Sequence, residues 1–275
     1  MLFPSTKLVR RIEQAEAASL RALLEASGGA PVAAEIGGGL ALYRGPNSPQ
    51  NKVIGLGFEP LAQSALERIE RIYLDHGTPV QVELSTHADP AVSDLLVQRG
   101  YRPAGFENVM GRTLADLTDP ARPPALDVRQ ATDGEREAWI GVLTTGFHQR
   151  DGSAKVAAHD VVEREALDQI FREMADNPSL ARWVALWEGQ IAGGAGVSMR
   201  DGITQLFGAA THPDYRRRGI QSALLHARLQ AGRERGCELA VITTQPGSKS
   251  QENAQRAGFS LLYARAVWLR HPAAT

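Results

Sequence analysis

The chain has 275 residues, enough for two domains of ordinary size, and its 43% hydrophobic and 22% charged residues are typical of a globular protein. A net charge of −1 provides no overall field to attract nucleic acid or an anionic membrane, so any anion site must be local. The single cysteine, Cys237, excludes an internal disulfide and a cysteine metal cluster, and we predict no metal cofactor. The N-terminus lacks an apolar signal core and no run of about 18 apolar residues occurs, so we expect a cytoplasmic monomer or homodimer without a membrane partner.

We predict helices and strands in mixed order for the first half of the chain. The helices, identified by apolar residues at helical spacing, cover residues 4–26, 61–75 and 90–99. The strands cover residues 33–43, 53–58, 80–85 and 101–114. The first strand contains three consecutive glycines, residues 37–39, and is still predicted as one strand. A stiff proline-rich stretch, residues 119–124, is the predicted linker between domains at residues 1–118 and 125–275.

The second half is predicted to have the element order β-α-α-β-β-β-α-β-α-β, which makes the fold class mixed α/β. Its helices cover residues 134–146, 161–175, about 220–235 and 250–256. Its strands cover residues 126–130, 181–187, 191–199, 203–211, 239–244 and 261–269. Glu188-Gly189 and Asp201-Gly202 stand between neighbouring strands and predict tight hairpin turns.

The stretch from Tyr215 to Ser222 combines a basic loop, one glycine and the start of a helix, directly after a strand. The first backbone N–H groups of a helix have no partner within the helix, and the helix dipole favours an anion there. Gly219 lets a ligand approach the backbone because it has no Cβ, and three consecutive arginines add positive charge. We interpret this stretch as a phosphate-binding loop. The alternative is a solvent-exposed basic turn that caps an amphipathic helix.

The two halves of the chain match without a gap at a fixed offset of 158 positions. Residues 63–66 and residues 221–224 are both Gln-Ser-Ala-Leu, and we interpret the match as a duplicated fold. The match fails at the basic loop, where residues 216–219 fall on residues 58–61, Phe-Glu-Pro-Leu. That segment has no arginine and no glycine, and Pro60 has no N–H to donate. We therefore expect the first half to keep the scaffold and to lack the anion site.

With this element order and this loop, residues 126–269 resemble the GNAT superfamily of acetyl-CoA-dependent N-acetyltransferases, and the first half resembles a degenerate copy. The family's pyrophosphate signature, Gln/Arg-x-x-Gly-x-Gly/Ala, reads Arg216-x-x-Gly219-x-Gln221 here, with glutamine in place of the last small residue. The resemblance implies two GNAT-like domains in tandem, each with a mixed, mostly antiparallel sheet flanked by helices. It also implies transfer of an acetyl group from acetyl-CoA to the amine of a small molecule or peptide.

The resemblance assigns residues to the coenzyme A site. The basic loop would bind the pyrophosphate through backbone N–H groups, the end of the preceding strand would lie along the pantetheine, and the short helix over 250–256 would face the coenzyme arm. The residues implied are Ala210, Thr211, Arg216, Arg217, Arg218, Gly219, Ile220, Gln221, Ser222 and Asn253. An exposed helix position without a ligand is the alternative for Asn253.

Acetyl transfer needs a donor to the thioester oxygen and an acid for the leaving thiolate. Members of the family often use a backbone N–H near the strand end as the donor and, as the acid, a tyrosine at the position of Ala254. Because that tyrosine is absent, we predict Tyr263 as the catalytic residue, with a core or rim tyrosine as the alternative. A coenzyme A-binding sensor without turnover is the alternative function. Nucleic-acid binding is disfavoured, since one cluster of three arginines offers few phosphate contacts.

Overall fold

The computed structural model describes residues 2–26, 32–46, 48, 50–118, 122–149 and 163–272. The chain divides into two compact units. Unit 1 comprises Met1–Met110, Thr243–Pro246 and Leu261–Thr275, and unit 2 comprises Gly111–Ile242 and Gly247–Ser260. The chain thus enters unit 2 at Gly111, before the linker predicted over 119–124, of which residues 119–121 lie outside the described residues. The last strand, which we assigned to the second domain, is part of unit 1.

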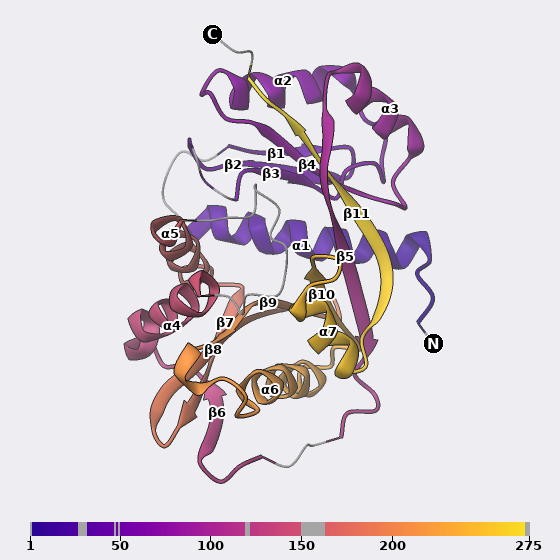
Figure 1. The fold of residues 1–275 in the computed structure, drawn as a ribbon. Coiled ribbons are helices and arrows are strands. Elements are labelled where there is room, and N and C mark those ends of the chain that lie inside the picture. The colour runs from indigo at the N-terminus through magenta and orange to yellow at the C-terminus, as the bar shows by residue number, and fades with distance from the viewer. Residues whose placement is uncertain are drawn as a thin grey trace. The chain divides into compact units, whose positions relative to one another are not determined.

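Unit 1 is a mixed sheet with three helices (Figure 1). Its helices are α1 (Thr6–Ala26), α2 (Gln63–Leu74) and α3 (Pro90–Gln98). Its strands are β1 (Val32–Ile36), β2 (Gly39–Tyr43), β3 (Lys52–Ile54), β4 (Val80–Ser85), β5 (Arg102–Thr113), which continues into unit 2, and β11 (Ser260–Arg270). The strand order is β1-β2-β3-β4-β11-β5, and β11 pairs antiparallel with β4 from Arg265↔Ser85 to Arg270↔Val80.

The single strand predicted over residues 33–43 is wrong, because the structure has an antiparallel hairpin there. β1 and β2 pair from Val32↔Tyr43 to Ile36↔Gly39, and Gly37 and Gly38 form the turn. Their φ angles are +52° and +83°, the left-handed conformation that a two-residue hairpin turn requires and that glycine adopts without steric cost.

A buried ionic cluster ties β11 to the rest of unit 1. Arg265 is fully buried, and its Nε lies 2.8 Å from Glu13 Oε1 while its Nη2 lies 2.6 Å from Glu16 Oε2. Its Nη1 lies 3.5 Å from Glu83 Oε2. Lys52 approaches the same group, with Nζ 3.2 Å from Glu83 Oε1 and 3.6 Å from Glu16 Oε1. A guanidinium without water needs such partners, so these carboxylates and the last strand stabilise one another.

Unit 2 contains the predicted element order up to its last helix. Its helices are α4 (Arg136–His148), α5 (Arg164–Ala175), α6 (Ile220–Glu234) and α7 (Lys249–Arg256), with short 3₁₀ turns at Asp133–Glu135 and Pro213–Tyr215. Its strands are β6 (Leu126–Gln130), β7 (Leu180–Trp187), β8 (Gln190–Arg200), β9 (Ile203–Thr211) and β10 (Leu239–Thr244), in the order β10-β9-β8-β7-β6. Positive φ angles at Glu188, Gly189, Asp201 and Gly202 confirm both predicted hairpin turns.

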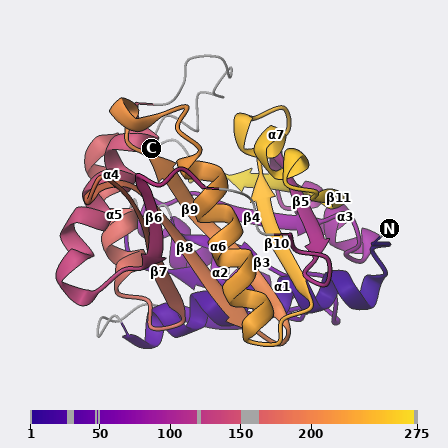
Figure 2. The same ribbon diagram turned by 90° about the horizontal axis from the view of Figure 1, so that it is seen from below.

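Helices α4 and α6 cover opposite faces of the sheet in unit 2. A Cβ on Gly193 would meet Ile220 of α6 at 2.7 Å, whereas a Cβ on the next residue, Gly194, would meet Val142 of α4 at 3.0 Å. Successive residues of a strand point to opposite faces, so the two helices lie on opposite sides. Figure 2 shows α6 lying along the strands. Glycines at these positions let both helices pack close to β8.

The predicted repeat is visible in the order and bounds of the elements. Adding 158 to the bounds of α2 gives residues 221–232, which lie inside α6. The same addition carries β4 onto residues 238–243, close to β10, and α3 onto residues 248–256, close to α7. Each copy therefore has a strand, a helix, a second strand and a short helix in the same succession. The structure confirms a mixed α/β chain with two copies of one scaffold in tandem.

Candidate functional site

The centre of the candidate site is a β-bulge in β9. The register with β8 shifts there, because Ala195 pairs with Ala209 while Gly196 pairs with Phe207, so that Gly208 is the extra residue. Gly208 has a φ of +28°, and a Cβ on it would lie 3.2 Å from Phe171 and from Met174 of α5. A bulge leaves its extra residue outside the ladder and re-aims the backbone. The bulge directly precedes the end of β9, where Ala210 and Thr211 were predicted to lie along the pantetheine.

The other edge of β9 is unpaired beside the bulge. The parallel register between β9 and β10 runs from Ile203↔Leu239 to Leu206↔Ile242 and includes no residue of β9 after Leu206. β9 itself continues to Thr211. An extended ligand could therefore lie along the last residues of β9, as the amide-containing pantetheine would. The predicted pair Ala210 and Thr211 lies in this segment, and the Thr211 hydroxyl is buried without a partner among the described atoms.

The basic loop joins β9 to α6 and has an unusual backbone. Arg217 has a φ of +62° and Gly219 has a φ of +80°, and Gly219 is the N-cap of α6. A left-handed conformation costs an arginine about 1–2 kcal/mol, and such costs cluster at ligand sites. Loops of this kind turn successive N–H groups toward one concave anion site. A Cβ on Gly219 would point into open space, so the volume above the loop is available to a ligand.

Side chains of the loop extend the positive charge around the start of α6. Arg218 places its guanidinium carbon 4.9 Å from the centre of the Trp187 ring and 5.4 Å from that of Tyr215, which are cation–π distances. Arg216 donates to the backbone carbonyl of Gln149 at the end of α4. Arg217 is exposed. Ile220 is buried and anchors the helix start, while the first N–H groups of α6, including those of Gln221 and Ser222, have no acceptor within the helix.

A buried arginine behind the bulge was not found by sequence reasoning. Arg228, in the middle of α6, is 1% exposed, and its Nη1 donates to the carbonyl oxygens of Gly196 (3.0 Å) and Phe207 (3.3 Å). Burial lowers its pKa to about 9, so the guanidinium keeps its charge at neutral pH. The signal in the sequence was an arginine one turn after Leu224 on the apolar face of α6, where a leucine would be expected.

In the corresponding loop of unit 1, three successive N–H groups are occupied. The carbonyl oxygen of Gly37 accepts from the backbone N–H groups of Gly57 (2.9 Å), Phe58 (3.2 Å) and Glu59 (3.2 Å). Glu59 is the counterpart of Arg217, since 59 plus 158 is 217, and the next residue is Pro60. The β1–β2 turn thus supplies an internal acceptor where unit 2 leaves open space.

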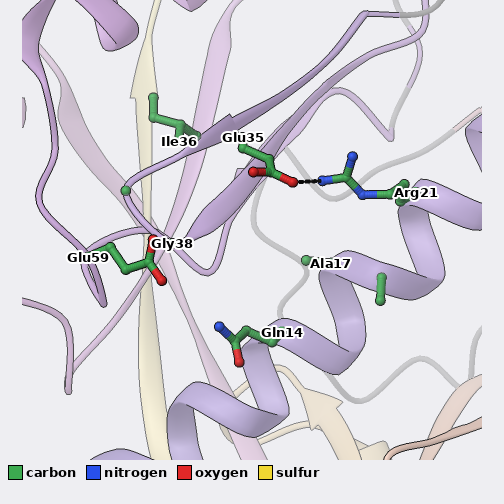
Figure 3. Close-up of a pocket in the computed structure, with 9 residues that line it drawn as sticks. Gln14, Ala17, Arg21, Glu35, Ile36, Gly38 and Glu59 are labelled. Atoms are coloured by element: carbon green, nitrogen blue, oxygen red, sulfur yellow. Dashed lines mark hydrogen bonds and ion pairs between the residues drawn. The ribbon is translucent and has the colours of Figure 1, made fainter.

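A pocket of about 440 Å³ lies beside this loop of unit 1 (Figure 3). In Figure 3, Gln14 and Arg21 face it from α1, Glu35 points toward Arg21, and Glu59 lies near Gly38. Arg21 Nη2 donates to Glu35 Oε1 over 3.0 Å. The pocket has a carboxylate, Glu59, at the position where unit 2 has an arginine. Glu59 is ion-paired with Arg10 of α1, so the loop of unit 1 carries an ion-paired carboxylate where the loop of unit 2 carries the exposed Arg217.

Tyr263, our predicted catalytic residue, lies on β11 in unit 1, whereas the basic loop lies in unit 2. It is 3% exposed, and its hydroxyl donates to Glu13 Oε1 over 2.6 Å. Burial and the neighbouring charge of Glu13 raise the pKa of this hydroxyl well above its usual range. The structure therefore gives the hydroxyl a structural partner, and its role as an acid stays a prediction. Asn253 is half-buried on α7 in unit 2, and its role also stays a prediction.

None of the helices in the described part of the chain is both long enough and apolar enough to cross a bilayer. Within the same residues, there is no group of three or more histidine, cysteine or acidic side chains that could hold a metal ion.

Comparisons with known proteins agree with this geometry. The model of the acetyltransferase (GNAT) family matches residues 147–259, which include the bulge, the basic loop and α6. A GCN5-related N-acetyltransferase from Kribbella flavida superposes with a TM-score of 0.68 at 18% identity, covering 96% of each chain. A tandem GNAT protein from the clavulanic acid biosynthesis pathway superposes with a TM-score of 0.63 at 11% identity, covering 94% of this chain and 88% of that chain. No curated protein matched the sequence.

These similarities confirm the predicted resemblance. Residues 147–259 match the model of the GNAT family, and the fold over nearly the whole length resembles that of GNAT proteins, one of them a tandem protein. A GNAT fold supports acetyl transfer in general terms. Identities this low show the fold alone.

Proposed function

We propose that the chain is an acetyl-CoA-dependent N-acetyltransferase that acts on the amine of a small molecule or peptide. The observation that carries the proposal is the succession of bulge, unpaired strand end and basic helix start in unit 2. Each part matches one part of acetyl-CoA, since the loop suits a pyrophosphate, the strand end suits the amides of pantetheine, and the bulge lies where the thioester would end. Acetyl-CoA would supply an acetyl group activated as a thioester.

The residues present fit this ligand. The N–H groups from Arg217 to Ser222 would bind the pyrophosphate, with the arginines of the loop balancing its charge. The Thr211 hydroxyl, buried and without a partner, would gain one from a pantetheine amide, which removes the cost of an unsatisfied buried group. A backbone N–H at the bulge would donate to the thioester carbonyl, and Tyr263 and Asn253 keep the roles that we predicted for them.

The proposal is tested first by screening for activity. Thiol release from acetyl-CoA is expected to depend on an added amine, across polyamines, amino acids, aminoglycosides and peptides. If release stays at background with all four classes while acetyl-CoA still binds, the chain is a sensor and the enzyme proposal fails.

The loop is tested by Gly219→Val, with Gly236→Val as its matched control. Both glycines have left-handed backbones, with φ of +80° and +76°, and open space where a Cβ would go, and they flank α6 at its start and its end. The strain on the fold should therefore be similar in the two variants. Only Gly219→Val should lower the affinity for coenzyme A, by at least about tenfold, or about 1.4 kcal/mol, in calorimetric titration. Equal affinities in the two variants would show that the ligand does not contact this loop.

A further inference from the structure

The bulge in β9 is held by a side chain from each face of the sheet. From α4, Trp139 Nε1 donates to the carbonyl of Ala195 over 3.1 Å. From α6, on the opposite face, Arg228 Nη1 donates to the carbonyls of Gly196 and Phe207. Gly196 and Phe207 pair with each other on one side of the register shift, and Ala195 lies on the other side. The two helices thus bond to backbone groups on both sides of the irregularity.

The bond from Arg228 determines the orientation of one peptide group. The carbonyl of Phe207 and the N–H of Gly208 belong to the same planar trans peptide unit, in which the C=O and N–H bonds point in opposite directions. Because the carbonyl is turned to the Arg228 guanidinium, the Gly208 N–H is turned away from it. The guanidinium is charged and fully buried, so its bond to the carbonyl is stronger than one between neutral groups.

The guanidinium has no anionic partner among the described residues. Its bonds go to three backbone carbonyls, those of Leu224 (3.0 Å), Gly196 and Phe207. A buried charge that is satisfied by carbonyls alone is costly to maintain, and an apolar side chain would fill the same position of α6 without that cost. A functional role for the orientation of the bulge, or for the positive charge behind it, would explain why a buried arginine stands at this position.

We propose that Arg228 is a positioning residue for acetyl transfer, which turns the Phe207–Gly208 peptide so that the Gly208 N–H donates to the thioester carbonyl. This inference rests on the proposed function, because it needs acetyl-CoA to lie along β9. Arg228 acts through the peptide group and makes no contact with the ligand itself. Its positive charge also favours the negative charge that develops on the carbonyl oxygen.

The sequence allows this single peptide group to be observed. Phe207 is the only phenylalanine in the chain that is followed by glycine. Protein labelled with ¹³C at phenylalanine carbonyls and with ¹⁵N at glycine therefore gives one carbonyl–amide cross-peak by NMR. In the wild type, acetyl-CoA is expected to shift the amide proton of that peak more than coenzyme A, which has no acetyl carbonyl. Arg228→Met should move the peak before any ligand is added and should abolish the difference between the two ligands.

Kinetics separates positioning from simple stabilisation. With an amine found in the screen, Arg228→Met should lower kcat by up to about 100-fold and leave the KM for acetyl-CoA within about twofold, because a misplaced donor affects the reaction more than binding. Arg228→Lys, which keeps the charge and one possible donor, should recover part of the loss. The control is Leu229→Ala, a buried neighbour on α6 that should reduce stability but leave the cross-peak and kcat unchanged.

The two proposals fail in different ways. If calorimetry shows that acetyl-CoA does not bind the wild type, the proposed function is wrong. If acetyl-CoA binds but the Phe207–Gly208 peak is unchanged, or if Arg228→Met leaves that peak and kcat as in the wild type, the role of Arg228 is wrong while the proposed function stands. If Arg228→Met does not fold, the same two readouts are taken on Arg228→Lys, for which a smaller shift of the peak and a smaller loss of kcat are expected, and wild-type values of both would show that the role of Arg228 is wrong.

Discussion

Replacing Arg265 by methionine removes the cation at the centre of the buried cluster and keeps a side chain of similar length. Arg265 bonds to Glu13, Glu16 and Glu83, so the variant leaves these three buried carboxylates without it, and Lys52 is close to only two of them, Glu16 and Glu83. Removing one partner of a buried ion pair costs about 3–5 kcal/mol. We therefore expect the free energy of unfolding to fall by about that amount at pH 7.

The pH dependence of this loss follows from Glu16. Burial alone would raise the pKa of Glu16, but the charges of Arg265 and Lys52 outweigh it and lower the pKa to about 2. A carboxyl whose pKa is 4.5 in the unfolded chain and about 2 in the folded one contributes about 3 kcal/mol at pH 7. That contribution is present above pH 4.5 and disappears as the pH falls toward 2. The difference between wild type and Arg265→Met should therefore be smaller at pH 3.5 than at pH 7, by roughly 1 kcal/mol.

The measurement is urea unfolding at both pH values, followed by circular dichroism. The control is Arg172→Met on α5, which removes an arginine with two carboxylate partners, Glu137 and Asp168, at a side chain that is 40% exposed. Surface pairs of this kind contribute about 0–1 kcal/mol. If Arg265→Met costs no more than Arg172→Met, or if its cost grows as the pH falls, the account of the buried cluster is wrong.

Coenzyme A should bind with a stoichiometry near one per chain, because the Gly37 carbonyl occupies the Glu59 N–H in unit 1 and Pro60 has none. A calorimetric stoichiometry near two would contradict this. Tyr263→Phe should lower the free energy of unfolding by about 1–3 kcal/mol in urea, since Glu13 loses a buried hydrogen bond. The same variant tests the predicted role of Tyr263 as the acid. If Tyr263 is the acid, kcat should fall while the affinity for acetyl-CoA stays unchanged, and a wild-type kcat would show that this role is wrong.

Local features of the fold could be predicted because local residues determine them. The hairpin turns at Glu188-Gly189 and Asp201-Gly202 need left-handed backbones, and the residues at those positions indicate it. The start of α6 was predicted from its glycine and arginines for the same reason. The hairpin at Gly37-Gly38 was missed because three consecutive glycines do not indicate which two of them form the turn. The repeat was visible because both copies keep the same spacing of elements.

Pairing over long distances could not be predicted in the same way. The alternation of apolar residues in β11 predicts a strand but does not specify its partner, and that partner is β4 in unit 1. The bulge at Gly208 depends on the register of two strands, which single residues do not reveal. In the sequence, Arg228 is one of many arginines in predicted helices. Its importance became apparent only from its burial and its hydrogen bonds to two strand carbonyls.

The position of β11 has a consequence for how the protein is made. The other strands of unit 1 lie within residues 32–113, whereas β11 ends at Arg270, and Arg265 bonds to Glu13 across 252 positions of sequence. At about 5–20 residues per second, synthesis of these 252 residues takes on the order of 10–50 s. During that time the edge of β4 that pairs with β11 is uncovered, and Glu13, Glu16 and Glu83 lack the ion pair with Arg265. An uncovered strand edge of this kind is prone to edge-to-edge pairing with other chains until β11 is made.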